Sequence, residues 1–154
     1  MKKIELGQAV SIFANLGVVV GVLLLVYELN QNRQMMQAQT RSNIAQGVSG
    51  LLFNLGSDPE LSSLWARGSA GEELDFEESN QFFNLLTGAL RYFEDVHYQY
   101  RNGLYDEVEF QGQKEQWRVL FSQKGYIDYW CERRIVFSPE FTEEIDGFVA
   151  STVC

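Results

Sequence analysis

Glu94 and His97 are the pair whose residue types and spacing are best suited to chemistry. They are three residues apart, so a helix places a carboxylate and an imidazole on one face. Di-iron helical bundles use this Glu-x-x-His spacing twice, with further glutamates from the other helices. His97 is the only histidine in the sequence, so the second copy is absent. We expect no metal and no cofactor, and the alternative is one metal held by Glu94, His97 and another acidic residue.

A polar helix face surrounds this pair. Four of its side chains, with charges of both signs, recur at helical spacing and are the predicted lining of a small ligand pocket: Arg91, Glu94, His97 and Arg101. The alternatives are a salt-bridge network for the charged members and a core position for His97, which shares a face with Phe93 and Tyr100. The pocket is therefore the place to look for a ligand.

No motif for nucleophilic catalysis is found. The sequence has no Gly-x-Ser-x-Gly turn, no P-loop and no dinucleotide-binding fingerprint. Cys131 lies between Trp130 and Glu132, which gives no clear support for a thiolate. Cys131 and Cys154 form neither a disulfide framework nor a metal-site pattern, so we expect free thiols in a reducing compartment. We predict no catalytic residue and no enzyme activity.

Composition limits the class of protein. The 154 residues fit one globular unit with an anchor, and 14% aromatic residues argue against disorder. The formal charge of −9 argues against nucleic acid as a partner, because binding phosphates requires clustered Lys and Arg.

The apolar run from Ala9 to Leu29 determines how the rest of the chain is organised. It is about as long as the roughly 20 residues that a helix needs to cross a bilayer. It exceeds a signal-peptide core of about 7–15 residues, and no small-x-small cleavage site follows it. We expect an uncleaved anchor. Lys2 and Lys3 on one side and Arg33 and Arg41 on the other do not set its orientation. The acidic domain with its unpaired cysteines favours the cytoplasm for that domain.

Gly17-Val-Val-Val-Gly21 is a G-x-x-x-G motif, which lets two membrane helices approach closely. Small residues, Glu28 and Met35 continue the same face, here called the small-residue face. Its predicted role is an oligomer interface of Gly7, Ser11, Ala14, Gly17, Gly21, Glu28, Met35, Ala38 and Ser42, continued by Ala45 and Ser49. The alternative for residues 38–55 is packing against the chain's own later helices. That alternative does not apply to residues 7–28, because no second apolar span is found.

Helical periodicity predicts an all-α fold. One long helix is expected from about residue 6 to 55, with apolar residues at Ile44, Val48, Leu51 and Leu55. Later helices are expected to begin at Asp58-Pro59, Asp75, Asp106, Tyr126 and Ser138-Pro139. The predicted domains are a transmembrane anchor (1–30), a stalk helix (31–56) and a soluble bundle of about four to five helices (57–154).

Three segments carry a resemblance to a known group: LVYELNQNRQMMQAQTR, RYFEDVHYQYRNGLYDEVEF and YWCERR. In this order after an apolar helix, they resemble a widespread group of small bacterial single-pass membrane proteins. The resemblance implies a bacterial inner membrane and a cytoplasmic domain, and it brings no activity with it.

The favoured function is therefore a membrane-anchored homo-oligomeric scaffold or interaction protein, with the lipid bilayer and other copies of the chain as partners. One alternative is an oligomeric pore, with Asn15, Glu28 and Gln31 lining a central path. A second alternative is a membrane-tethered ligand sensor or enzyme that uses the polar cluster around Glu94 and His97. A third is an accessory subunit of a larger membrane complex.

Overall fold

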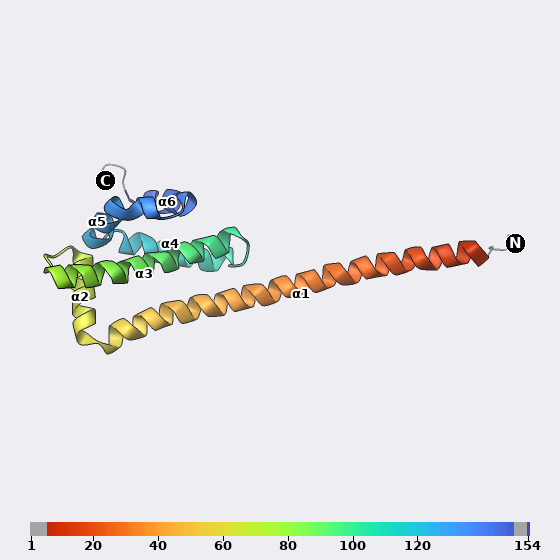
Figure 1. Cartoon of the computed structure of the whole chain (residues 1–154), viewed down its shortest axis with the longest axis horizontal. Helices are drawn as coiled ribbons and strands as arrows, with labels where there is room; N and C mark the ends of the chain where they lie inside the picture. Colours follow the sequence, from red (N-terminus) through yellow and green to blue (C-terminus); the bar gives the residue numbers. More distant parts are fainter. Residues whose placement is uncertain (1–5, 150–153) are drawn as a thin grey trace. The chain divides into compact units, whose positions relative to one another are not determined.

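The computed structural model describes residues 6–149 and residue 154. These residues form six α-helices, one short 3-10 helix and no strand, which confirms the predicted all-α class (Figure 1). The helices are α1 (Leu6–Ser57), α2 (Pro59–Ala70), α3 (Phe76–Arg101), α4 (Glu107–Leu120), α5 (Lys124–Arg133), the 3-10 helix η1 (Arg134–Val136) and α6 (Pro139–Asp146).

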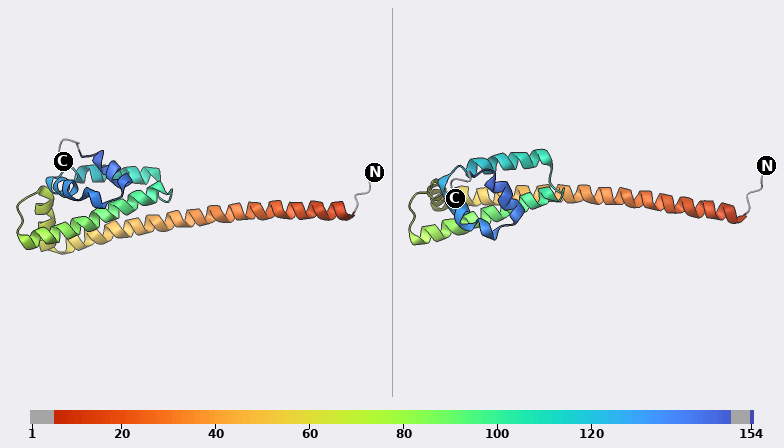
Figure 2. Two further views of the ribbon diagram at one scale, coloured as in Figure 1. Left: turned by 45° about the horizontal axis from the view of Figure 1, so that its top comes forward. Right: turned by 90° about the horizontal axis from the view of Figure 1, so that it is seen from above.

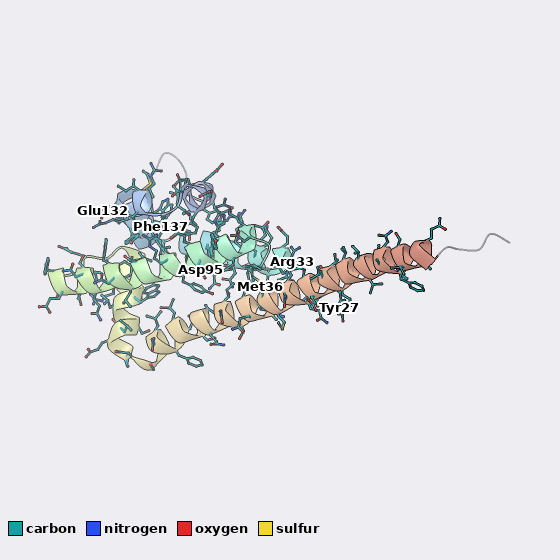
Figure 3. The ribbon with its side chains drawn as sticks, turned by 45° about the vertical axis from the view of Figure 1, so that its right-hand side comes forward. Tyr27, Arg33, Met36, Asp95, Glu132 and Phe137 are labelled. Carbon is teal, nitrogen blue, oxygen red and sulfur yellow. A yellow bond between two sulfur atoms is a disulfide. The ribbon has the colours of Figure 1, made fainter. Side chains whose placement is uncertain are left out.

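The chain divides into two compact units, Met1–Gln39 and Thr40–Cys154. The described part of the first unit belongs to α1, and its side chains stand out from the helix around Tyr27 (Figure 3). The second unit contains the last part of α1 and all the later helices, which gather into one bundle (Figure 2). The second unit begins inside the predicted stalk, because residues of α1 after Gln39 contribute to its core.

Aspartates cap the N-termini of three of the helices, at the positions where the sequence predicts helix starts. The carboxylate of Asp58 accepts hydrogen bonds from the backbone N–H groups of Glu60 and Leu61, at 3.0 and 3.1 Å. Asp75 and Glu78 form a reciprocal capping box at the start of α3, and Asp106 caps α4. Each cap satisfies backbone donors that a helix start leaves unpaired, which fixes where these helices begin.

The core of the second unit is built mainly from aromatic side chains. α3 packs against α2, α4 and α6, and α2 packs against α5. The largest fully buried side chains are Trp117, Trp130, Tyr126, Phe110 and Phe141. The Nε1–H of Trp130 donates to Asp146 at 2.8 Å, which joins α5 to the end of α6. Helical spacing predicts the inner faces of α3 and α4, and most of the predicted residues are buried: Phe82, Leu86, Ala89, Phe93, His97, Phe110, Trp117 and, just after α4, Phe121. Two further predicted residues, Tyr100 and Leu120, are half-buried.

The last turns of α1 belong to this core. Ile44 and Leu55 are buried, as their spacing predicts, while Val48 and Leu51 are half-buried. The hydroxyl of Tyr92 on α3 donates to the backbone carbonyl of Ile44 at 2.9 Å. The Tyr92 ring lies where a side chain on Gly47 would begin, so that glycine lets α3 approach α1 closely.

The cysteines correct one expectation. Cys131 and Cys154 are joined by a disulfide, with sulfur atoms 1.97 Å apart and Cα atoms 5.2 Å apart. The prediction that both cysteines are free thiols was therefore wrong. Two cysteines alone form no recognisable framework in the sequence, and only the fold brings Cys154 next to Cys131 of α5. Because the thiols are not free, they no longer favour a cytoplasmic location of the domain.

Candidate functional site

An open pocket of about 460 Å³ lies in the second unit, between α3, α4 and α6. His97 and Arg101 reach it from α3, and Lys114 and Arg118 from α4. The remaining lining comes from α6 and the residues just after it: Glu140, Glu143, Glu144, Gly147 and Phe148. The pocket therefore contains two of the four predicted pocket residues.

Charges of opposite sign are paired along its walls. Arg101 Nη2 lies 3.1 Å from Glu140 Oε1, and Lys114 Nζ lies 2.6 Å from Glu144 Oε1. The ring of Phe148 forms an apolar wall, with the guanidinium of Arg118 centred 5.2 Å from its centroid. A ligand that carries both a cationic and an anionic group would find a complementary partner for each in this pocket.

His97 is the buried member of the pocket. It is 5% exposed and lies against the rings of Phe110 and Phe141, with centroids 6.0 and 5.8 Å away. Its Nε2 lies 3.9 Å from Glu144 Oε2, which exceeds hydrogen-bond distance. The core position is therefore confirmed.

Burial also determines the charge of His97. It lowers the pKa of His97, and the neighbouring Glu144 carboxylate opposes this effect only in part. The imidazole is therefore neutral near neutral pH, with one nitrogen able to donate a hydrogen bond and the other able to accept one.

Arg91 and Glu94 are directed elsewhere and do not line the pocket. Glu94 Oε1 accepts a hydrogen bond from the backbone N–H of Ser138 at 2.6 Å, and Glu94 Oε2 accepts one from Arg91 at 2.6 Å. Arg91 also donates to the carbonyl of Val136 at 3.0 Å. Burial raises the pKa of Glu94, but the hydrogen bonds from Ser138 and Arg91 more than offset it, so the pKa is lowered overall. These two side chains hold the connection into α6.

This separation bears on the predicted metal alternative. Glu94 and His97 share a helix face but do not converge, because Glu94 is bonded to Ser138 and Arg91 while His97 faces Glu144. No group of three possible metal ligands is found within residues 6–149 and 154. The described lining of the pocket contains neither a hydroxyl nor a thiol nucleophile. The lining consists of charged side chains, one imidazole, one aromatic ring and Gly147.

The second candidate surface lies along α1. By length and composition this helix could cross a membrane: an 18-residue window has a mean hydropathy of 2.6, and none of it is buried. At Gly7, Gly17 and Gly21 an added side chain would meet nothing within 4 Å. The remaining members of the small-residue face are exposed: Ser11, Ala14, Glu28, Met35, Ala38, Ser42, Ala45 and Ser49. The whole predicted face is thus accessible.

In the second unit, the core and the small-residue face use different sides of α1. Ile44, Gly47 and Leu55 face the domain, whereas Ser42, Ala45 and Ser49 are exposed. The alternative that residues 38–55 of this face pack against the chain's own later helices is therefore wrong for the three exposed residues. The domain uses the apolar stripe and leaves the small side chains uncovered.

The sequence contains two further signals. A seven-residue repeat runs along the small-residue face: Gly7, Ala14, Gly21, Glu28, Met35, Ser42 and Ser49. This repeat is typical of helices that pack in parallel along a narrow seam. The sequence indicates the pocket residues on α4 and α6 only weakly, because nothing in it distinguishes Lys114, Arg118 and Glu144 from ordinary surface residues.

No family model, curated protein or solved structure matches the chain. The function is therefore inferred from α1 and from the His97 pocket.

Proposed function

We propose that this protein is a single-span, membrane-anchored scaffold or interaction protein that assembles with copies of itself through α1. One observation carries the proposal: the most apolar 18-residue window of α1 is entirely unburied. Removing apolar surface from water is worth about 25 cal/mol per Å², so a long helix with this composition is strongly favoured in a bilayer. The lipid bilayer is accordingly the first proposed partner.

The small-residue face supports self-association. Without side chains at Gly17 and Gly21, two helix backbones can approach closely, and van der Waals packing is the main force between helices in lipid. The seven-residue repeat continues this face beyond the apolar run to Ser42 and Ser49, which are exposed. A parallel pair of α1 helices would then bury one seam from the membrane into the stalk.

The membrane itself is assigned from the resemblance described above, which favours a bacterial inner membrane. A constant second protein on the small-residue face would instead make the chain an accessory subunit. Purification of the intact protein separates these cases, because a homo-oligomer needs no other component.

The first test measures membrane attachment. Bacterial membranes that contain the full chain are extracted with alkaline carbonate, which releases peripheral proteins and leaves spanning ones in the pellet. We expect the chain in the pellet. Complete release into the supernatant would overturn the anchor.

The second test measures the oligomeric mass in mild detergent by light scattering. We expect an oligomer for the natural chain and a shift towards monomer for Gly17→Leu combined with Gly21→Leu, because the leucines hold the backbones apart. Val19→Leu combined with Val26→Leu is the matched control on the opposite side of α1, and it should leave the mass unchanged. A monomeric natural chain would contradict self-association.

A second candidate function is ligand sensing at the His97 pocket, favoured by its paired charges and its buried imidazole. Free amino acids carry the matching pair of charges and form a suitable probe set for thermal-shift measurements. A ligand at about 100 times its Kd would stabilise the fold by about 2.7 kcal/mol. The shift should disappear in Lys114→Ala and persist in Lys124→Ala, whose ion pair with Asp128 is outside the pocket. Equal shifts in both variants would exclude the pocket.

A further inference from the structure

We infer that the helical domain, Thr40–Cys154, lies on the oxidising side of the membrane that α1 spans. The inference rests on the proposed membrane span, and the Cys131–Cys154 disulfide carries it. It goes against the cytoplasmic placement that the sequence suggested.

Buried residues lie close in the chain to each of the two cysteines. Ile145 and Val149 are buried in the core, and Val149 is five residues before Cys154. On α5, Cys131 follows Trp130, which is fully buried and bonded to Asp146 of α6. The Cα atoms of the two cysteines are 5.2 Å apart, within the usual range for a disulfide.

The bond is accessible to solvent. Cys131 is half-buried and Cys154 is exposed, so soluble thiols can reach the sulfur atoms. Forming the bond removes two protons and two electrons from the two thiols. In thiol–disulfide exchange these pass to a disulfide-bearing oxidant, which leaves as a dithiol. The thiol pools of the cytosol drive this exchange in reverse, so an accessible disulfide persists in an oxidising compartment.

The charges that flank the apolar run do not decide the orientation, so the disulfide does. Lys2 and Lys3 precede the run and Arg33 and Arg41 follow it, which gives two basic residues on each side. With the domain on the oxidising side, Lys2 and Lys3 lie on the reducing side.

The first experiment measures the thiol state of the natural full chain. Cells are quenched with acid, and the protein is treated with a maleimide–polyethylene glycol that adds mass at each free thiol. We expect no added mass before reduction and two additions after reduction. The Cys131→Ser variant, with one thiol left, should take one addition without reduction. Two additions to the natural chain before reduction would overturn the inference.

The second experiment measures sidedness without the disulfide. Glu77 is exposed near the start of α3, so Glu77→Cys is placed in a chain with Cys131→Ser and Cys154→Ser. A membrane-impermeant maleimide should label it as strongly in intact spheroplasts as in lysed ones. Labelling only after lysis would overturn the inference.

Carbonate extraction on the same samples separates the two proposals. A chain that stays in the pellet but is labelled only after lysis keeps the anchor and loses the orientation. A chain released by carbonate loses the anchor, whatever its thiol state.

Discussion

His97 is nearly buried, yet charged groups from two neighbouring helices face it. Glu144 and Glu140 come from α6 and Lys114 from α4, while Arg101 lies one turn further along α3. Protonation would place a positive charge where solvent reaches only 6% of the side chain. The nearest carboxylate, Glu144, is already bonded to Lys114. The folded protein therefore favours the neutral imidazole.

This preference predicts a pH dependence of stability. The pKa of His97 is lowered from 6.5 in the fold, so the unfolded chain binds a proton first as pH falls. The stabilisation is complete above about pH 6.5 and is lost as pH falls through the lowered pKa, with a slope of at most about 1.4 kcal/mol per pH unit. Chemical denaturation between about pH 7.5 and 5 measures it.

His97→Gln is the matching control for this prediction. Glutamine keeps a polar side chain of similar length that does not titrate, so its stability should be flat over the same range. The carboxylates with lowered pKa values, such as Glu94, have an ordinary pKa of 4.5 and act mainly at lower pH. An identical slope in the natural chain and in His97→Gln would contradict the assignment to this residue.

The sequence predicts which face of α3 these residues occupy but not what they touch. Helical spacing correctly places His97 with Phe93 in the core, since local geometry determines it. Helical spacing cannot tell that Arg101 lines the pocket while Glu94 does not. Glu94 binds Ser138 and Arg101 pairs with Glu140, and both partners come from a segment some forty residues away. Two of the four predicted pocket residues, Arg91 and Glu94, therefore hold the connection into α6 instead of lining the pocket.

At the scale of elements, the contact between α2 and α5 is unusually close. A side chain at Gly125 would begin 1.9 Å from the carbonyl oxygen of Gly68, and one at Gly68 would overlap the ring of Phe82. Backbone lies directly on backbone at this point, so the contact cannot relax by moving a side chain. Glycine is required here by space.

Gly125→Ala should therefore destabilise the domain by about 1–3 kcal/mol, because the two helices must separate. Gly88→Ala is the control within α3, where an added side chain meets nothing within 4 Å. It should stabilise the domain by about 0.5–1 kcal/mol, since alanine favours a helix over glycine. Denaturant unfolding of both variants in detergent tests the pair, and equal effects would show that the close contact has no energetic role.

Helix starts are the part of the fold that the sequence predicts best. Asp58, Asp75 and Asp106 cap α2, α3 and α4, since a capping carboxylate acts on its own next turn. The α5 region was harder, because Gln123 makes no side-chain cap and α5 begins at Lys124, two residues before the predicted Tyr126. Gly125 in the first turn of α5 lies directly against the backbone of Gly68, a contact that no local signal reveals.

At the scale of the molecule, the disulfide closes a loop between residues 131 and 154. Loops of this size reduce the freedom of the unfolded chain, and removing such a bond costs about 2–4 kcal/mol. We expect Cys131→Ser, or treatment of the natural chain with a reductant, to lower the free energy of unfolding by that amount. The reductant should have no effect on Cys131→Ser, and a loss of stability there would contradict the role of the bond.

The separate sides of α1 have a consequence for how substitutions act. Within residues 40–57, the side that contains Ile44 and Leu55 supports the fold, while the side that contains Ser42 and Ser49 is free of it. Changes on the first side should lower cellular abundance through unfolding and degradation. Changes on the second should alter assembly at constant abundance. The two properties can therefore vary independently within a single helix, so the assembly of this protein could change over evolution while its domain stays intact.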